Sequence, residues 1–293
     1  MYYSYIKMDI DIYYNEVIKL KKKKFRKYCI NKEKTLNNIP LPIISRGNHI
    51  EAILIEMRKM DHLSFIIKNA ILKLGSEVSF TIVCGNLNYE FFNNISKSIN
   101  RDIRIINIGK DTLSREEYSI MLLTSNFWNQ FLGQKLIIYQ EDTIIFRKLD
   151  KKFLQYDYIG APLENRLIGN GGLSFRSKNI MIQICRDYYD KFRTKMEKNV
   201  KMLNKHKLIL SKNKIDYIRI KDLYFFYVVE KNILEDCNIT DIMRLYNIGK
   251  LPPFETAREF SVEKFSHPNP FGGHAFWYCI FKMEPWLDSN LKY

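Results

Sequence analysis

The chain has 293 residues, 46% of them hydrophobic and 14% aromatic, so it can bury a large core and is expected to be globular. Its net charge of +15 suits an anionic partner such as a nucleic acid, a phosphate-bearing substrate or a membrane surface, but it names no ligand. Five widely spaced cysteines with no C-x-x-C pair argue against a disulfide framework or a zinc site, and no apolar run approaches the roughly 20 residues of a membrane span.

Much of the positive charge lies in two lysine-rich runs, 19–34 and 191–221. Such runs usually form solvated faces or loops, the lysine abundance is also typical of an AT-rich genome, and these runs contain no recognisable nucleic-acid motif. We therefore predict a basic N-terminal extension over 1–47, which ends in the loop-prone "NNIPLPIISRGN", and one main domain over 48–293. We expect no nucleic-acid partner and no membrane span.

The first half of the main domain alternates strands and helices. The patterns predict strands at 49–57, 77–85, 103–109 and 135–140, and helices at 61–75, 89–99 and 114–133. Asp61 is the expected N-cap of the first helix, and Gly75 its stop. This alternation predicts an α/β fold with a mostly parallel, Rossmann-like sheet flanked by helices, whose ligands bind beyond the carboxyl ends of the strands.

The second half is less regular. It contains "DYIGAP" at 157–162, a turn-prone "IGNGG" at 168–172 and a strand-like stretch at 173–177. Helices are predicted near 178–205 and 221–231, and 260–279 is expected to be rich in loops.

Four stretches carry residues suited to chemistry. In "YQEDT" (139–143) two acids interrupt an apolar run at a predicted strand end, which indicates either a β-turn or a site for Mg²⁺ or Mn²⁺. The glycines of "GNGG" (169–172) suit a hairpin or a close approach of backbone to ligand, and their spacing is not that of a Walker loop.

The other two stretches offer a base and a ligand. In "KDLYFF" (221–226), Asp222 fits either a helix cap or a general base. In "PFGGHAFW" (270–277), His274 fits either a structural hydrogen-bond donor or a ligand for Mn²⁺.

Taken in order, these stretches resemble a largely uncharacterised family of glycosyltransferase-like proteins from giant DNA viruses, bacteria and fungi. The likeness covers roughly residues 49–279 and rests on the order of its motifs: "EMR" (56–58), "LTSNFW" (123–128), "QED" (140–142), "DYIGAPL" (157–163), "NGGLSFR" (170–176), "KDLYFF" (221–226), "FSVE" (260–263) and "PFGGH" (270–274). The resemblance implies a GT-A-type fold in which a D-x-D-like motif binds a divalent metal, Mn²⁺ or Mg²⁺, with the diphosphate of a nucleotide-sugar.

The resemblance also assigns roles at this site. Asp142 and His274 are the implied metal ligands, and Gln140 takes the place of the usual first acid, with Glu141 as the variable middle position. Asp222 is the implied base of an inverting reaction. The implied donor and acceptor contacts are Glu56, Arg58, Gly85 and Asn86 on the nucleoside side, and Asn170, Gly171 and Gly172 on the sugar and acceptor side.

The chain departs from the family pattern at three positions. Leu163 replaces a tryptophan, Lys221 stands where the family's E-D-x-F-F helix has its first acid, and Gln140 leaves one certain acid in the D-x-D-like motif.

We therefore expect a metal-dependent hexosyltransferase that uses a nucleotide-sugar, a UDP-sugar in the first instance, and a glycan, protein or small-molecule acceptor. The expected compartment is the cytoplasm, or the host cytoplasm or virion for a viral protein. The alternatives are a catalytically inactive nucleotide-sugar- or glycan-binding protein of the same fold and, less favoured, a basic nucleic-acid-associated protein.

Overall fold

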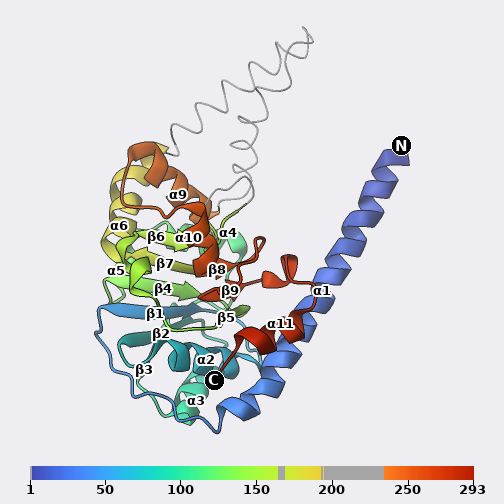
Figure 1. The fold of residues 1–293 in the computed structure, drawn as a ribbon. Helices are drawn as coiled ribbons and strands as arrows, with labels where there is room; N and C mark the ends of the chain where they lie inside the picture. Colours follow the sequence, from blue (N-terminus) through green and yellow to red (C-terminus); the bar gives the residue numbers. More distant parts are fainter. Residues whose placement is uncertain (1, 164–168, 193, 195–233) are drawn as a thin grey trace.

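The computed structural model describes residues 2–163, 169–192, 194 and 234–293. These residues form a mixed α/β fold around a six-stranded sheet of order β3-β2-β1-β4-β7-β6 (Figure 1). The four strands from β3 to β4 are parallel neighbours, and β7 runs antiparallel to both β4 and β6. The strands are β1 (Ile50–Ile55), β2 (Val78–Cys84), β3 (Ile103–Asn107), β4 (Lys135–Tyr139), β6 (Tyr158–Gly160) and β7 (Leu173–Ser177).

Both faces of the sheet are buried. Along β1, Ala52 and Leu54 belong to one hydrophobic cluster, whereas Ile53 and Ile55 belong to the other, because successive strand side chains point to opposite faces. The first cluster includes side chains of α2 (Leu63–Leu74) and α3 (Tyr89–Ile99). The second includes side chains of α4 (Arg115–Leu122), α5 (Ser125–Asn129), α6 (Lys178–Gln183) and α9 (Glu235–Tyr246). Burial on both faces explains the continuous apolar runs 52–55 in β1 and 136–139 in β4.

The predicted alternation of strands and helices between 49 and 140 is confirmed, with two local corrections. The N-cap of α2 is His62 rather than Asp61, while Gly75 ends that helix at a positive φ of 80° as predicted. The single helix expected at 114–133 is two short helices, α4 and α5, because Thr124 adopts an extended conformation between them. Ser114 begins α4 with a capping box to Glu117.

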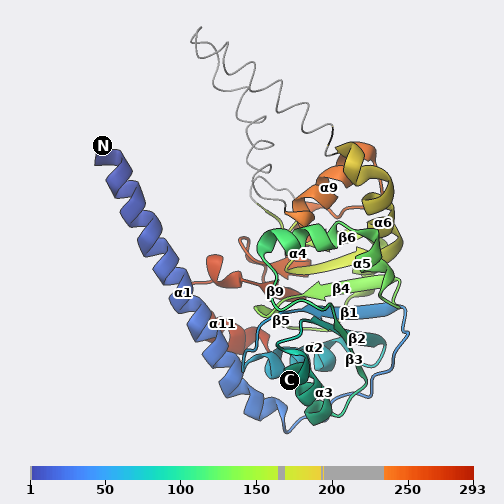
Figure 2. The same ribbon diagram turned by 180° about the vertical axis from the view of Figure 1, so that it is seen from behind.

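The N-terminal segment forms one long helix, α1 (Tyr2–Leu36). Its C-terminal half packs on α2, on the short 3₁₀ helix η5 (Phe276–Tyr278) and on α11 (Met283–Asn290), while its N-terminal half extends away from the body (Figures 1 and 2). Phe25, Tyr28 and Cys29 are buried in the first hydrophobic cluster. The sequence predicts 1–47 as an extension outside the main domain. Half of this basic segment nevertheless contributes to the core of the domain.

A second, three-stranded sheet of order β5-β9-β8 adjoins the end of β4. It consists of β5 (Thr143–Ile145), β8 (Ser261–Val262) and β9 (Gly272–His274), with α10 (Phe254–Phe260) directly before β8. The segment 260–279, expected as loops, thus supplies two short strands. Because β5 and β9 pair antiparallel with Thr143 opposite His274, the C-terminal motif meets the end of β4.

Other predictions fall partly or wholly outside the described residues. The helix expected from 178 begins as α6 and continues as a π-helical turn, Ile184–Tyr188, but all of 195–205 and all of 221–231 lie beyond the described ranges. Among the helices that the structure describes, none is both long and apolar enough to cross a membrane.

Candidate functional site

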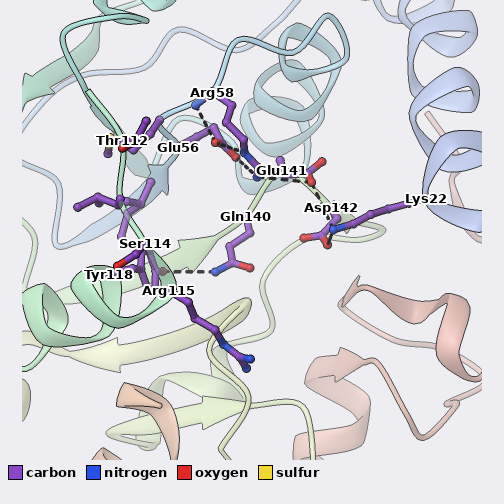
Figure 3. A pocket seen from close by; sticks show the side chains of 13 residues that line it. Lys22, Glu56, Arg58, Thr112, Ser114, Arg115, Tyr118, Gln140, Glu141 and Asp142 are labelled. Atoms are coloured by element: carbon purple, nitrogen blue, oxygen red, sulfur yellow. Dashed lines mark hydrogen bonds and ion pairs between the residues drawn. The ribbon is translucent and has the colours of Figure 1, made fainter. Parts of the chain in front are cut away.

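A cavity of about 540 Å³ opens at the carboxyl edge of the parallel strands (Figure 3). It is lined by residues 55–58 at the end of β1, by 112–115 leading into the start of α4, and by 140–142 after β4, together with Lys22 of α1 and Tyr118 of α4. This is the edge at which parallel α/β sheets bind ligands, and the volume suits a small-molecule site. The cavity therefore lies where the strand pattern predicts a site.

Gln140, Asp142 and His274 meet beside this cavity. The Nε2 atom of His274 lies 3.1 Å from Asp142 Oδ1 and 3.1 Å from Gln140 Oε1. The antiparallel pairing of β5 with β9 brings His274 beside Asp142. The Ala275 N–H also donates a hydrogen bond to the Asp142 carbonyl. Ala275 adopts a left-handed φ of 47°, a conformation costing about 1–3 kcal/mol that is often found at functional sites. The two metal ligands implied by the resemblance, Asp142 and His274, are therefore brought together with Gln140, the residue in place of the usual first acid.

Neighbouring charges shift the pKa values of both Asp142 and His274. Burial alone would raise the pKa of Asp142, but the His274 imidazole and the Lys22 ammonium hold it well below its usual range. Burial would likewise lower the pKa of His274, but Asp142, followed by the buried Glu263, raises it. Asp142 and His274 thus each favour the charged form of the other, and Lys22 adds positive charge beside Asp142.

Glu141 has a separate set of partners. Its Oε1 accepts a hydrogen bond of 2.8 Å from Arg26, and its Oε2 lies 2.9 Å from His62 Nε2. Burial alone would raise the Glu141 pKa, but the hydrogen bond from His62 and the contact with Arg26 hold it below its usual value. Glu141 thus connects the end of β4 with Arg26 of α1 and with His62 at the start of α2.

The glycine loop before β7 lies against both sides of the site. A Cβ added at Gly172 would come within 2.3 Å of His274 Nε2, and one at Gly171 would come within 2.8 Å of Glu235 Oε1. Asn170 orients the loop, because its Oδ1 accepts a hydrogen bond of 2.9 Å from the Gly172 N–H. The glycines are therefore required by close packing against side chains.

Asp236 lies on the other side of this loop. Its Oδ2 accepts a hydrogen bond of 2.8 Å from the Gly171 N–H, and the neighbouring Glu235 pairs with the fully buried Arg176 at 2.8 Å. Burial, followed by the negative charge of Glu235, raises the pKa of Asp236 to about 7. A carboxylate that titrates near neutral pH is suited to accept a proton in a reaction.

Asp236 was not among the residues predicted from the sequence, and Asp222, which was, lies outside the described residues. The feature of the sequence that could have indicated this site is the pair of adjacent acids at the start of α9, Glu235 and Asp236. They match the acids of the E-D-x-F-F pattern, whereas Lys221 and Asp222 precede the matching aromatic residues.

The expected nucleoside-side residues divide into two groups. Glu56 and Arg58 line the cavity, and the Arg58 guanidinium donates to both carboxylate oxygens of Glu56 at 2.8 and 2.7 Å. Gly85 and Asn86 follow β2 on the same edge, but Asn86 is exposed and donates to Asp111, and neither residue is part of the cavity lining among the described residues.

The donor atoms at Gln140, Asp142 and His274 fit a hard or borderline divalent ion. Separations of 3.1 Å are those of neighbouring ligands at right angles around an ion with bonds of about 2.1–2.2 Å. Within the described ranges, no cluster of three or more His, Cys, Asp or Glu side chains is arranged to hold a metal, so an ion here would need further ligands from substrate or water.

A family model described as "Protein of unknown function (DUF5672)" matches residues 102–274. The match covers more than half of the 293 residues and includes Asp142, the glycine loop, Asp236 and His274, but it excludes α1, β1 and β2. A search of curated proteins found no match to the chain. The chain belongs to the DUF5672 family of proteins of unknown function.

Proposed function

We propose that this protein is a metal-dependent glycosyltransferase of GT-A type that transfers a sugar from a nucleotide-sugar, first of all a UDP-sugar, to an acceptor hydroxyl. The observation that carries the proposal is the meeting of Gln140, Asp142 and His274 within 3.1 Å contacts at the carboxyl edge of the parallel strands. The ordered motifs of the resemblance support the same activity.

The proposed metal site uses the Asp142 carboxylate, the His274 imidazole and the Gln140 amide oxygen. These oxygen and nitrogen ligands suit Mn²⁺ or Mg²⁺, and the phosphates of a donor would complete the coordination. When bound, such an ion supplies Lewis-acid stabilisation of the charge that develops on the leaving diphosphate. The protein's own task at this point is to hold the ligand atoms in place through the β5–β9 pairing.

Asp236 is the proposed general base. Its pKa of about 7 leaves a substantial deprotonated fraction near neutral pH, and its hydrogen bond to Gly171 fixes it beside the loop expected to contact sugar and acceptor. A positioned base of this kind contributes about 10²–10⁴-fold to a proton-transfer step. Deprotonation of the acceptor hydroxyl by Asp236 would allow direct displacement with inversion.

The metal and the donor are tested together by thermal unfolding with UDP-, GDP- and CMP-sugars, with and without Mn²⁺. We expect metal-dependent stabilisation of the wild type that Asp142→Ala and His274→Ala both abolish. Asp102→Ala is the matched control, because Asp102 is exposed and directly precedes β3 at the opposite edge of the sheet. Metal-independent binding, or full transferase activity in Asp142→Ala, contradicts the mechanism.

The base is tested separately by comparing Asp236→Asn with Asp222→Asn. We expect the rate of sugar transfer to fall by about 10²–10⁴-fold in Asp236→Asn while donor binding persists. A comparable loss in Asp222→Asn alone would transfer the role to Asp222.

One observation favours a second candidate, a nucleotide-sugar- or glycan-binding protein without catalysis. The first ligand position of the motif is the neutral Gln140, whose Nε2 lies within 3.4 Å of the Tyr118 hydroxyl. This candidate requires binding of a nucleotide-sugar or glycan without hydrolysis or transfer under any metal, so product analysis separates it from the first.

A further inference from the structure

The C-terminal half of α1 is fixed against the walls of the candidate site. The Phe25 ring contacts the rings of His62, Phe276 and Trp277 at centroid distances of 6.2, 5.7 and 5.5 Å. Lys21 adds a hydrogen bond of 2.8 Å to the Trp277 carbonyl. This packing holds the helix turn that carries residue 22 at a defined position beside the cavity.

Lys22 extends from α1 toward Asp142 and lines the cavity (Figure 3). Its Nζ lies 3.7 Å from Asp142 Oδ2 and 3.7 Å from Glu141 Oε1, and its side chain remains 37% exposed. These distances exceed the roughly 2.7–3.2 Å of a hydrogen bond. The ammonium is therefore near two carboxylates but is not hydrogen-bonded to either one.

Its cationic neighbours are more fully engaged. Arg26 donates to Glu141 at 2.8 Å, and Arg58 donates to Glu56 at 2.7 Å. Lys22 therefore retains hydrogen-bond donors that a ligand in the cavity can use. A lysine ammonium is a compact charge with three donors and a common phosphate-binding group.

The two oxygens of Asp142 face different side chains. Oδ1 faces His274 at the proposed metal site, whereas Oδ2 faces Lys22. A diphosphate that completed a metal shell on the Oδ1 side would lie next to an ammonium on the Oδ2 side. This arrangement places two sources of positive charge around the same phosphate position.

We propose that Lys22 binds the diphosphate of the donor and that α1, which lies outside the family match over 102–274, is part of the active site. The inference rests on the proposed function, because it assumes a nucleoside diphosphate in the cavity. The competing interpretation is that Lys22 only neutralises Asp142 and Glu141.

The test is isothermal titration of UDP and of inorganic pyrophosphate, with Mn²⁺ present, into wild type, Lys22→Met and Lys22→Arg. Methionine keeps the apolar stem, and arginine keeps the charge. Lys24→Met is the matched control, because Lys24 is exposed on the same helix and its replacement changes the net charge equally. Thermal unfolding of each variant verifies that it is folded.

We expect Lys22→Met to weaken both ligands at least about tenfold, Lys24→Met to leave them unchanged, and Lys22→Arg to restore most of the affinity. Equal binding by wild type and Lys22→Met, or equal weakening by Lys22→Met and Lys24→Met, overturns the role of Lys22 and leaves the proposed function intact. Failure of wild type to bind UDP or any nucleotide-sugar removes the proposed function itself, and this inference with it.

Discussion

Arg26 and Glu141, which are 115 positions apart in the sequence, form a hydrogen-bonded ion pair of 2.8 Å between α1 and the end of β4. The adjacent carboxylate, Asp142, instead faces His274 at 3.1 Å. The two acids that interrupt the apolar run 136–146 therefore have separate tasks. Glu141 anchors the N-terminal helix, and Asp142 belongs to the candidate metal site.

The Arg26–Glu141 pair predicts a measurable loss of stability in Arg26→Ala. The variant leaves Glu141 buried with fewer cationic partners, but Arg26 is 36% exposed and His62 remains, so we expect a loss of about 1–2 kcal/mol in the free energy of unfolding. Urea denaturation measures it. Lys27→Ala, an exposed position on the same helix, is the control, and equal stability of the two variants would contradict the anchoring role.

The parallel part of the central sheet could be predicted from the sequence because its apolar runs alternate with helical patterns. The apolar runs of β1, β2 and β4 leave few alternatives, and Gly75 ends α2 as expected. The second sheet could not be predicted, because β8 has two residues and β9 is Gly-Gly-His, and neither shows strand alternation. Its consequence, the proximity of His274 and Asp142, was implied only by the family resemblance.

The contribution of α1 to the core and to the cavity could not be predicted from the sequence, for a different reason. A lysine-rich run is usually a solvated face, and only the folded chain shows that Phe25 is buried and that Lys22 and Arg26 point to the strand end. Asp236 was missed because its raised pKa comes from burial and from Glu235 in three dimensions. Long-range packing of this kind is not encoded in local sequence patterns.

The contact between Gly172 and His274 predicts that Gly172→Ala destabilises the protein. The added methyl would lie 2.3 Å from the imidazole, and overpacking of this kind costs about 1–3 kcal/mol. Thermal unfolding of Gly172→Ala, His274→Ala and the double variant tests the cause. We expect the double variant to be as stable as His274→Ala, because the ring is gone, while additive losses would show that the methyl clashes elsewhere.

Asp236 predicts a specific pH dependence of stability. Its pKa is raised to about 7 by burial and by Glu235, so the folded state holds this proton more tightly than the unfolded chain, where Asp titrates near 3.9. The stabilising contribution is present below about pH 4 and is lost as pH rises through about 7. Comparison with Asp236→Asn removes the contribution of all other groups.

We therefore expect the stability of Asp236→Asn relative to wild type to improve as pH rises from about 5 to about 8. Urea unfolding of both proteins across this range measures the difference. A difference that is constant with pH would show that Asp236 keeps an ordinary pKa in the folded state.

We predict that Gln140→Glu increases the affinity of the candidate metal site for a divalent ion. The substitution is nearly isosteric and places a second carboxylate where Gln140 Oε1 already lies 3.1 Å from His274 Nε2. The added charge attracts a divalent ion, and we expect Mn²⁺ to bind at least about tenfold more tightly without nucleotide, equivalent to about 1.4 kcal/mol. Because a bound ion stabilises the folded state, Mn²⁺ should raise the unfolding temperature of Gln140→Glu more than that of the wild type.

Gln134→Glu is the matched control for this gain. Gln134 is exposed immediately before β4, at the opposite end of the strand from Gln140, so the same substitution adds the same charge away from the site. Titration of Mn²⁺ into both variants separates a local ligand effect from a change in net charge. Equal affinities in the two variants would mean that position 140 is not a metal-ligand position, because a ligand's contribution depends on contact and a net-charge effect does not.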